Sequence, residues 1–509
     1  MKQQITAART YREKLLADPH RPAFHFTVPD DNGMPGDPNG AFFADGVYHL
    51  MYLYRNSGTE AFHWGHISSR DLLHWRHHPD ALLTNEGDQG CFSGGAFVDD
   101  DGTAYLSFWK FPSADGRKDN GGIALACARP PYDVWERMEP IAVEGTEWGI
   151  RDVELEGQTV HLGCADPSNI WKMNGFYYMQ LGALCVLNKY GREENSPPEY
   201  QGDWTELFRS RDLKHWEFVH RFYTNTHAGE DWPDHTEDDM CPSFLPLYDA
   251  PAGGNFTGKW LQLFISHNKG CQYYIGTLDE AAETFLPEVH GRMSWQDNTC
   301  FAPEALVDGN NRQILWTWLH DNPENDFETY GWAGVYSFPR VVWLQDGELH
   351  MAPAEELAQL QYNHQIFDVP TAGRIPVKNG LLCRLKAQWH AADTDGAGLC
   401  VRVSSDGSEY TAIFYDHAAG KLVMDTTRSG CDGRRIREEA PFCLKEGEEL
   451  SLDLFIDRSV IEVYANQRQA LCRRVYPTAP AEADGICLAP GAAAPCTLEA
   501  WELDAANPY

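Results

Sequence analysis

Residues 36–43 read GDPNGAFF, and this stretch is the first of five similar segments that together decide the fold. The other four are CFSGGAFV at 91–98, CADPSNIW at 164–171, MCPSFLPL at 240–247 and CFAPEALV at 300–307. In each segment a small or acidic residue leads into a strand-like run, and four of the five carry a proline at the same place. The segments start roughly 55 to 75 residues apart, which is the size of one four-stranded blade. Five such units predict a five-bladed β-propeller whose innermost strands begin at the central axis.

The rest of the chain also reads as strands and turns. Short apolar runs such as YHLMYLY (48–54) and RQILWTWLH (312–320) are separated by glycine-rich turns. The stretches HISSRDLLHW (66–75) and LFRSRDLKHW (207–216) repeat one pattern, which predicts an outer strand, a turn and a buried tryptophan. We therefore expect an all-β fold: a five-bladed β-propeller over 1–350 that starts with an amphipathic helix, a helical linker over 351–365, and a C-terminal β-sandwich over 366–509.

Composition narrows the class of function. The 509 residues are enough for two or three domains, and 41 basic against 75 acidic residues give a formal net charge of −34. This charge argues against nucleic acid or a membrane surface as a partner. The 14 cysteines show no metal-binding spacing, and no signal peptide or membrane span is visible. We expect a cytoplasmic protein with reduced thiols, no metal and no cofactor.

Two aspartates are the first candidates for chemistry. Asp37 and Asp166 stand at the start of predicted inner strands, so both side chains are expected to reach the propeller axis. Two carboxyl groups that converge in one site are the minimal machinery for glycoside hydrolysis, because one can attack the anomeric carbon while a protonated group assists the leaving oxygen. Taken alone, each Asp-Pro pair is also typical of a simple β-turn.

Several stretches then resemble glycoside hydrolase family 32, the invertases, inulinases and levanases. The resemblance rests on the opening from RPAFHF (21–26) through GDPNGAFF, and on FHWGHISSRDLLHW (62–75), GCFSGGAF (90–97), CFAPEALVDGNNRQILWTWL (300–319) and SFPRVVWLQDGELHMAPAEEL (337–357). It continues in the sandwich with LFIDRSVIEVYANQRQALCRRVYP (454–477). These stretches follow the order of the family over most of residues 21–478.

The resemblance implies a retaining mechanism on a β-fructofuranoside with no metal. Asp37 matches the nucleophile, and Asp166 matches the aspartate that stabilises the transition state through the sugar hydroxyls. The residues Asn39, Trp64, Phe92 and Ser93 match positions that bind the substrate. A homodimer is possible, since the sandwich can contribute to an interface.

The sequence also departs from the family at four positions. Gly36, Leu53 and Ala165 stand where the family has the polar sugar contacts Asn, Gln and Arg. Met240 stands where the family has its acid/base glutamate, and a methionine cannot donate a proton. The best substitute on an inner strand is Glu304, and the acidic loop before Met240 offers Glu230, Asp234, Glu237, Asp238 and Asp239. The plain alternatives are a hydrogen-bond partner for Glu304 and a solvated acidic run for the loop.

These observations favour a furanoside-active glycosidase that differs from a typical sucrose hydrolase. Short fructo-oligosaccharides, difructose anhydrides or another furanoside are the expected substrates. Two alternatives stay open at this point: a fructosyltransferase of the same fold, and a propeller that has lost catalysis and only binds a glycan.

Overall fold

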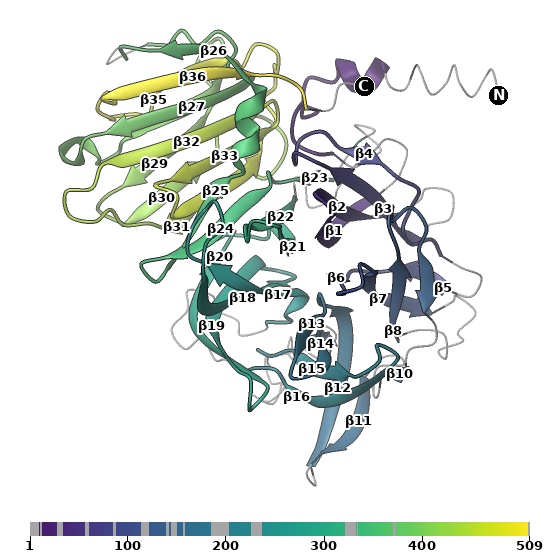
Figure 1. Cartoon of the computed structure of the whole chain (residues 1–509). Coiled ribbons are helices and arrows are strands. Elements are labelled where there is room, and N and C mark those ends of the chain that lie inside the picture. The colour runs from purple at the N-terminus through teal and green to yellow at the C-terminus, as the bar shows by residue number, and fades with distance from the viewer. Residues whose placement is uncertain are drawn as a thin grey trace.

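The computed structural model describes residues 10, 13–27, 34–55, 61–84, 88–112, 122–138, 142–143, 150–155, 158–184, 203–224, 237–320, 332, 334–369 and 373–506. Figure 1 shows two β-rich parts, a ring of blades around an axis and a separate pair of sheets. Of the predicted N-terminal helix, residues 13–17 are described and helical. The all-β prediction, with a propeller followed by a sandwich, is confirmed.

The ring contains five groups of strands in the described residues. Blade one has β1 (Met34–Ala44), β2 (Val47–Arg55), β3 (Phe62–Ser69) and β4 (Arg76–His77). Blade two has β5 (Asp88–Cys91), β6 (Ala96–Val98), β7 (Ala104–Pro112), β8 (Gly122–Ala128) and β9 (Glu136–Met138). Blade three has β10 (Ala142–Val143), β11 (Ile150–Leu155), β12 (Gln158–Pro167), β13 (Trp171–Met173), β14 (Phe176–Ala183), β15 (Glu206–Ser210) and β16 (His215–Arg221). Blade four has β17 (Met240–Tyr248), β18 (Phe256–Ser266), β19 (Gly270–Asp279) and β20 (Thr284–Arg292). Blade five has β21 (Cys300–Val307), β22 (Gln313–Leu319), β23 (Val335–Tyr336), β24 (Arg340–Gln345) and β25 (Glu348–Pro353).

The repeated proline marks a β-bulge. In β1, β12, β17 and β21 the register against the neighbouring strand shifts at this proline. The residue before it is Asp37, Asp166, Cys241 or Ala302. The last three have positive φ angles of 39°, 49° and 45°, a conformation that re-aims a side chain at a bulge. The same local device is thus built into four blades, and it decides which side chain turns toward the axis.

Hydrogen bonds between neighbouring blades close the ring just outside the axis. Their donors and acceptors lie on or next to the inner strands: Gly94 N to Asn39 Oδ1 (3.3 Å), Ser107 Oγ to Ser168 O (2.7 Å), Asn169 Nδ2 to Phe244 O (2.9 Å) and Ala41 N to Glu304 Oε1 (2.6 Å). The last of these joins blade five to blade one. A buried polar group needs such a partner, so these contacts also hold the inner strands at fixed positions.

The outer turns confirm the second sequence repeat. Ser69 and Asp71 in blade one, and Ser210 and Asp212 in blade three, accept hydrogen bonds from the backbone of the residues that follow them. In blade three the Asp212 carboxylate also pairs with His215 Nδ1 at 2.8 Å. Trp216 is buried directly after this turn, as the repeat predicts, whereas Trp75 at the same place in blade one is only partly buried.

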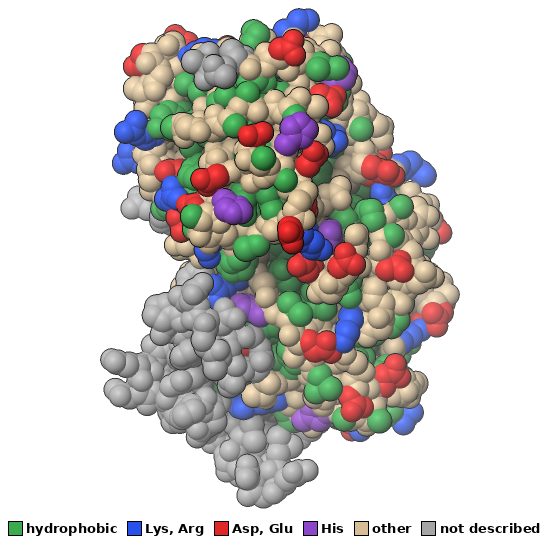
Figure 2. Space-filling view, turned by 90° about the vertical axis from the view of Figure 1, so that its left-hand side faces the viewer, with side chains coloured by type: hydrophobic (Ala, Val, Ile, Leu, Met, Phe, Trp, Pro, Cys, Tyr) green, Lys and Arg blue, Asp and Glu red, His purple; other side chains and the backbone are tan. Residues whose placement is uncertain are grey.

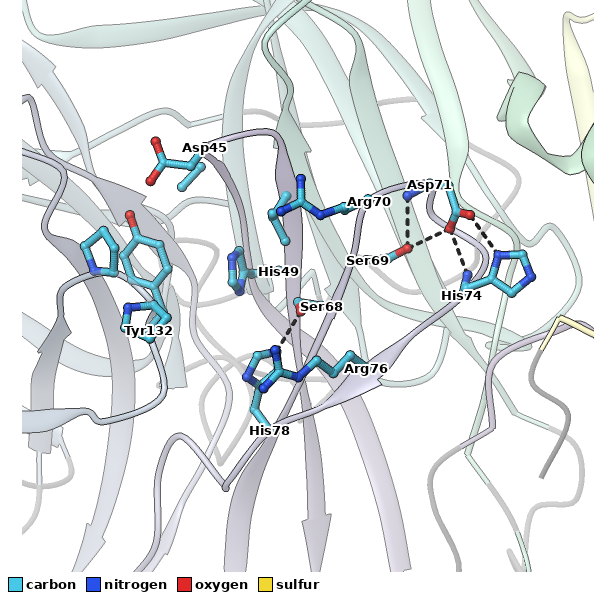
Figure 3. Close-up of a pocket in the computed structure, with 14 residues that line it drawn as sticks. Asp45, His49, Ser68, Ser69, Arg70, Asp71, His74, Arg76, His78 and Tyr132 are labelled. Carbon is cyan, nitrogen blue, oxygen red and sulfur yellow. Dashed lines mark hydrogen bonds and ion pairs between the residues drawn. The ribbon is translucent and has the colours of Figure 1, made fainter.

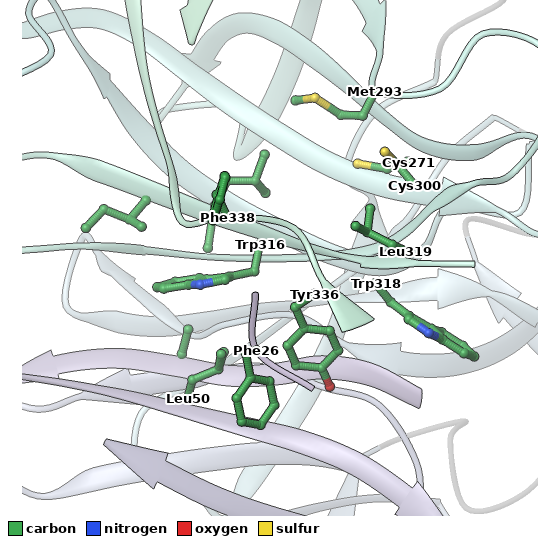
Figure 4. Packing of buried hydrophobic residues seen from close by; sticks show 14 of the residues in the cluster. Phe26, Leu50, Cys271, Met293, Cys300, Trp316, Trp318, Leu319, Tyr336 and Phe338 are labelled. Atoms are coloured by element: carbon green, nitrogen blue, oxygen red, sulfur yellow. The ribbon is translucent and has the colours of Figure 1, made fainter. Parts of the chain in front are cut away.

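One large hydrophobic cluster links blades one, four and five to the sandwich (Figure 4). Figure 4 shows Phe26, Trp316 and Tyr336 packed near one another between the strands. Thr27 pairs with Val335 of blade five, and Tyr336 Oη donates to the Gly36 carbonyl at 3.1 Å. The segment before β1 therefore lies against the last blade and helps to close the ring.

The sandwich consists of a six-stranded and a five-stranded sheet around a second core. The first sheet has β26 (Gln361–Ile366), β27 (Leu382–Trp389), β32 (Leu450–Asp457), β33 (Val460–Ala465), β34 (Gln469–Arg474) and β36 (Thr497–Leu503). The second has β28 (Gly398–Val403), β29 (Thr411–Asp416), β30 (Lys421–Asp425), β31 (Arg437–Pro441) and β35 (Gly485–Leu488). A short 3₁₀ helix, η4 (Ala391–Asp393), follows β27.

The segment predicted as a helical linker is only partly helical. A 3₁₀ helix, η3 (Glu355–Leu360), follows β25 directly. Gln361 is extended and pairs with Leu503, so residues 361–366 already form the first strand of the sandwich. Pairing with β36 therefore overrides the helical periodicity that the sequence suggests for this stretch.

A single carboxylate joins the N-terminal segment to the sandwich. Asp457, at the end of β32, accepts hydrogen bonds from the backbone nitrogens of Ala23 (2.7 Å), Phe24 (2.9 Å) and His25 (2.8 Å). It also lies 2.9 Å from His25 Nδ1, and both side chains are fully buried. Burial alone lowers the pKa of His25, but hydrogen bonds to Asp457 and Glu462 raise it on balance. We call this set of contacts the Asp457 clamp.

The surface agrees with the acidic composition. Figure 2 shows carboxylate side chains spread over the described part of one face, interspersed with fewer basic ones. Within the described ranges, no helix is both long and apolar enough to cross a membrane. Twelve cysteines in the described part of the chain are free thiols.

Candidate active site

The two predicted catalytic aspartates lie together and share a cysteine thiol. Cys241 Sγ lies 3.5 Å from Asp37 Oδ2 and 3.6 Å from Asp166 Oδ2. The three side chains come from β1, β12 and β17, and each residue directly precedes the repeated proline. Since one sulfur atom contacts both carboxylates, the aspartates face the same small volume at the axis of the propeller.

The pair is electrostatically unsymmetrical. Burial raises the pKa of Asp37, while the Ser93 hydroxyl, the Cys241 thiol and the charge of His267 oppose that rise. Burial, followed by the negative charge of Asp37, raises the pKa of Asp166 to about 7. Burial and the two carboxylates raise the pKa of Cys241 well above its usual range, so the sulfur keeps its proton and donates it. Because the charge of Asp37 raises the pKa of Asp166, Asp37 is the member of the pair that loses its proton first.

The raised pKa of Asp166 predicts a pH-dependent cost to stability. Above its ordinary pKa of 3.8, the unfolded chain loses a proton that the folded chain keeps until about pH 7, so stability falls across this window. Asp166→Asn removes this titration. We therefore expect the free energy of unfolding of the variant, relative to wild type, to be higher at pH 8 than at pH 4.5, by about 1.4 kcal/mol per unit of pKa shift.

Urea unfolding of both proteins at the two pH values measures this difference. Asp45→Asn, in the exposed turn after β1, is the control and should show the same small effect at both. A stability difference between Asp166→Asn and wild type that does not change with pH would contradict a raised pKa.

The four predicted substrate-binding residues surround the pair in different ways. The Ser93 hydroxyl donates directly to Asp37 Oδ2. Asn39 is buried. Its Nδ2 donates to the Asp37 carbonyl, and its Oδ1 accepts the Gly94 backbone N–H of blade two. Trp64 is 0% exposed, and its Nε1 donates to the Phe92 carbonyl at 3.2 Å. Phe92 is partly exposed. Among the four, Ser93 contacts the Asp37 carboxylate and Phe92 is partly exposed, whereas the Asn39 and Trp64 side chains bond to the backbone. Substrate binding by all four stays a prediction.

Glu304 connects blade five to the backbone of blade one. Its Oε1 accepts the Ala41 backbone N–H at 2.6 Å, and burial raises its pKa well above the usual range. Glu304 follows its repeated proline, as Asn39 does, whereas Asp37 and Asp166 precede theirs. In the described residues no hydrogen bond joins Glu304 to either aspartate. Its role as the acid/base stays a prediction.

Met240 is buried at the start of blade four, and Glu237 and Asp238 just before it are paired with other side chains. Met240 is 0% exposed in the main hydrophobic cluster. Glu237 pairs with the buried Lys269 at 2.5 Å, and Asp238 pairs with His267. Glu230 and Asp234, the other proposed acids, lie outside the described residues.

Asp239, the last of these acids, is buried. Burial and the charges of Asp203 and Glu237 raise its pKa well above the usual range. His267 is not among the residues predicted from the sequence, although its charge acts on both Asp37 and Asp166.

The departures at Gly36, Leu53 and Ala165 leave no polar side chain at these three positions. A Cβ at Gly36 would lie 2.9 Å from Leu53 Cδ2, so the leucine occupies the space that a side chain at 36 would need. Leu53 and Ala165 are both buried in hydrophobic clusters. Leu53 thus places a large apolar side chain directly beside Gly36, which has none.

A separate cavity of about 540 Å³ lies between blade one and residues 130–132 (Figure 3). Figure 3 shows Arg70 and Arg76 near it and Ser68 joined to His78, whose Nε2 lies 2.6 Å from Ser68 Oγ. Among the described residues that line this cavity, none is a predicted site residue. The cavity is therefore distinct from the carboxylate pair. Over the described ranges, no group of three or more potential metal ligands is present.

Comparison with known families gives two adjacent matches. Residues 25–353 match the model described as "Glycosyl hydrolases family 32 N-terminal domain". Residues 355–502 match "Glycosyl hydrolases family 32 C terminal". Together these matches cover both the propeller and the sandwich.

Individual proteins are similar over the whole chain. A raffinose invertase of Escherichia coli is 27% identical over 496 residues, which cover 94% of this chain and 95% of that protein. A sucrose-6-phosphate hydrolase of Zymomonas mobilis is 28% identical over 527 residues, with 97% and 94% covered. The crystal structure of fructan 1-exohydrolase IIa from Cichorium intybus superposes with a TM-score of 0.78 at 21% identity, over 96% of this chain and 98% of that one.

Proposed function

Because the chain belongs to glycoside hydrolase family 32 and is a glycosidase, we propose that it hydrolyses β-fructofuranosides, or a related furanoside, with retention of configuration. We further propose that short fructo-oligosaccharides or difructose anhydrides are better substrates than sucrose. The observation that carries the mechanism is the Cys241 thiol, which lies within 3.6 Å of both Asp37 and Asp166.

In this mechanism Asp37 is the nucleophile. Its carboxylate attacks the anomeric carbon and forms a covalent glycosyl ester, while the glycosidic oxygen leaves with a proton. The Ser93 hydroxyl and the Cys241 thiol hold Asp37 Oδ2, which leaves the other oxygen to attack. Water then attacks the ester and releases the sugar with its original configuration.

Asp166 acts on the sugar rather than on the anomeric carbon. With a pKa near 7, its carboxyl is largely protonated when Asp37 is charged. A protonated carboxyl can both donate and accept hydrogen bonds, which suits a group that binds sugar hydroxyls in the transition state. The same asymmetry concentrates the negative charge on the attacking group.

The three positions without polar side chains support the proposed substrate preference. Gly36, Leu53 and Ala165 offer no side-chain hydrogen bond to a sugar hydroxyl, and Leu53 fills the space beside Gly36. A buried hydroxyl without a partner costs about 1–3 kcal/mol, so a sugar pose that relies on contacts there is disfavoured. A furanoside that binds in another pose, through its second sugar, avoids this loss.

One observation favours a second candidate function, a propeller that binds a glycan without cleaving it. Met240 is fully buried where the resemblance calls for the proton donor. The products distinguish this candidate from a fructosyltransferase. A glycan-binding propeller forms no product, whereas a transferase forms a new glycoside.

The test is a substrate panel analysed by chromatography and by NMR in 10% methanol. We expect release of fructose from 1-kestose, a difructose anhydride and 4-nitrophenyl β-D-fructofuranoside, with kcat/KM for sucrose at least about tenfold lower, as the loss of one buried hydrogen bond predicts. Methyl β-D-fructofuranoside as the methanol product would support retention, whereas the α anomer would contradict it. Binding of these sugars without turnover of the aryl furanoside would favour the glycan-binding candidate, and a preference for sucrose would overturn the substrate proposal.

A further inference from the structure

We propose that His267, oriented by Asp238, is the general acid and base of this site and replaces the glutamate that is absent at Met240. The inference rests on the proposed function, because it assigns the proton transfer in that reaction.

The Asp238–His267 pair is built by the first hydrogen bonds of blade four. Met240 pairs with Ile265 across β17 and β18, so Asp238 faces the residues that follow β18. His267 N donates to Asp238 Oδ2 at 3.3 Å, and His267 Nδ1 lies 3.2 Å from the same oxygen. The Asp238 carboxylate is fully buried, so it fixes both the tautomer and the direction of the ring. With Nδ1 facing Asp238, we assign the proton transfer to Nε2.

This pair stands beside the two aspartates. Asp238 lies three residues before Cys241, whose thiol contacts both Asp37 and Asp166. Met240 pairs with Ile265, so Cys241 and His267 lie at the same end of β17 and β18. The charge of His267 also lowers the pKa of each aspartate.

The His267 ring is also placed where a substrate can reach it. The ring packs edge-on against Phe301 of β21, at 5.6 Å between centroids. The backbone carbonyl of His267 accepts a hydrogen bond from Asn298 Nδ2 at 2.7 Å. The His267 side chain is 40% exposed, whereas Asp238 is not. A positioned and accessible imidazole therefore lies next to the nucleophile.

The other described acids are less suited to the task. Glu237 is held by Lys269 Nζ at 2.5 Å and Gln272 Nε2 at 2.8 Å. Glu304 is held by the Ala41 backbone. Asp239 is buried near Asp203, which with burial raises its pKa well above the usual range. By contrast, His267 is an imidazole oriented by the buried Asp238 and partly exposed, which suits a group that exchanges protons with a substrate.

The proton balance closes over the two steps. As Asp37 bonds to the anomeric carbon, the glycosidic C–O bond breaks, and the leaving oxygen takes the Nε2 proton and departs as an alcohol. The neutral imidazole then takes a proton from the water that attacks the ester. That attack releases Asp37 as a carboxylate and restores the protonated His267.

The test compares two leaving groups in the full-length protein. For His267→Gln, kcat/KM on methyl β-D-fructofuranoside should fall about 10²–10⁴-fold, because an alkoxide needs a proton to leave. On 4-nitrophenyl β-D-fructofuranoside, whose phenolate leaves unaided, we expect a fall below about tenfold. The alkaline limb of the pH profile on the methyl glycoside should also disappear, and added imidazole should restore part of the rate.

His215→Gln is the matched control, since His215, at the start of β16 in blade three, forms the same kind of pair with Asp212. It should change neither substrate. Equal effects of His267→Gln on the two substrates, or none, would overturn the assignment, as would a selective loss in Glu304→Gln with His267→Gln active. Wild-type cleavage of the aryl glycoside alone would exclude a proton donor altogether. Failure of the proposed function is separate, because it appears as a wild type inactive on both substrates.

Discussion

Asp37→Asn is expected to abolish hydrolysis of aryl and alkyl furanosides alike, with kcat/KM lower by roughly 10⁴-fold or more. An amide cannot form the glycosyl ester, and this bond must form whichever group leaves. The amide oxygen can still accept the Ser93 hydroxyl, so the local packing is retained. The effect should therefore be one of chemistry and not of folding. Initial rates on 4-nitrophenyl and methyl β-D-fructofuranoside measure it.

Two comparisons make this result specific. Asp45→Asn, eight residues further along the chain in an exposed turn, should hydrolyse both substrates at the wild-type rate. The melting temperature of Asp37→Asn should equal or exceed that of wild type, because burial raises the pKa of Asp37 and its charge is therefore a cost to folding. Residual activity within about tenfold of wild type would mean that another group attacks the sugar.

The second large effect concerns stability. Asp457→Ala removes the acceptor of His25 Nδ1 and of three backbone N–H groups, of which those of Phe24 and His25 are buried and that of Ala23 is partly buried. Breaking such a buried charged cluster from one side typically costs about 3–5 kcal/mol, because the backbone donors lose their acceptor and His25 keeps only Glu462 as a charged partner. We expect a fall of this size in the free energy of unfolding.

Guanidinium unfolding followed by tryptophan fluorescence measures the Asp457→Ala effect. The control is Asp453→Ala, on the same strand, whose carboxylate pairs with Arg384 at 2.6 Å and is partly exposed. Removal of a partly exposed pair should cost about 1 kcal/mol or less. Equal losses in the two variants would mean that the Asp457 clamp adds nothing beyond an ordinary ion pair.

Much of the fold can be predicted from the sequence because its main signals are local. A proline that enters a strand both marks the start of each inner strand and breaks the ladder, and the structure has a bulge at those prolines. Leu357 and Leu360 suggested a continuous helix after blade five, but Gln361 pairs with a strand about 140 residues away. Local periodicity contains no information about such a distant partner.

The site divides in the same way. Asp37 and Asp166 could be found because each directly precedes its proline. Glu304 differs from them because it follows its proline. His267 carries no such mark. Its position depends on the pairing of β17 with β18 and on a carboxylate 29 residues earlier. Only the folded blade brings the two together.

The Asp457 clamp has a consequence for the order in which the chain folds. Residues 23–25 leave the ribosome long before their acceptor, which is more than 430 residues behind them. The segment that closes the ring against blade five therefore lacks this partner until all five blades and β32 of the sandwich have been made. Contacts of such long sequence separation form late and slow the final step of folding. Closure of the propeller is thus coupled to the formation of the sandwich.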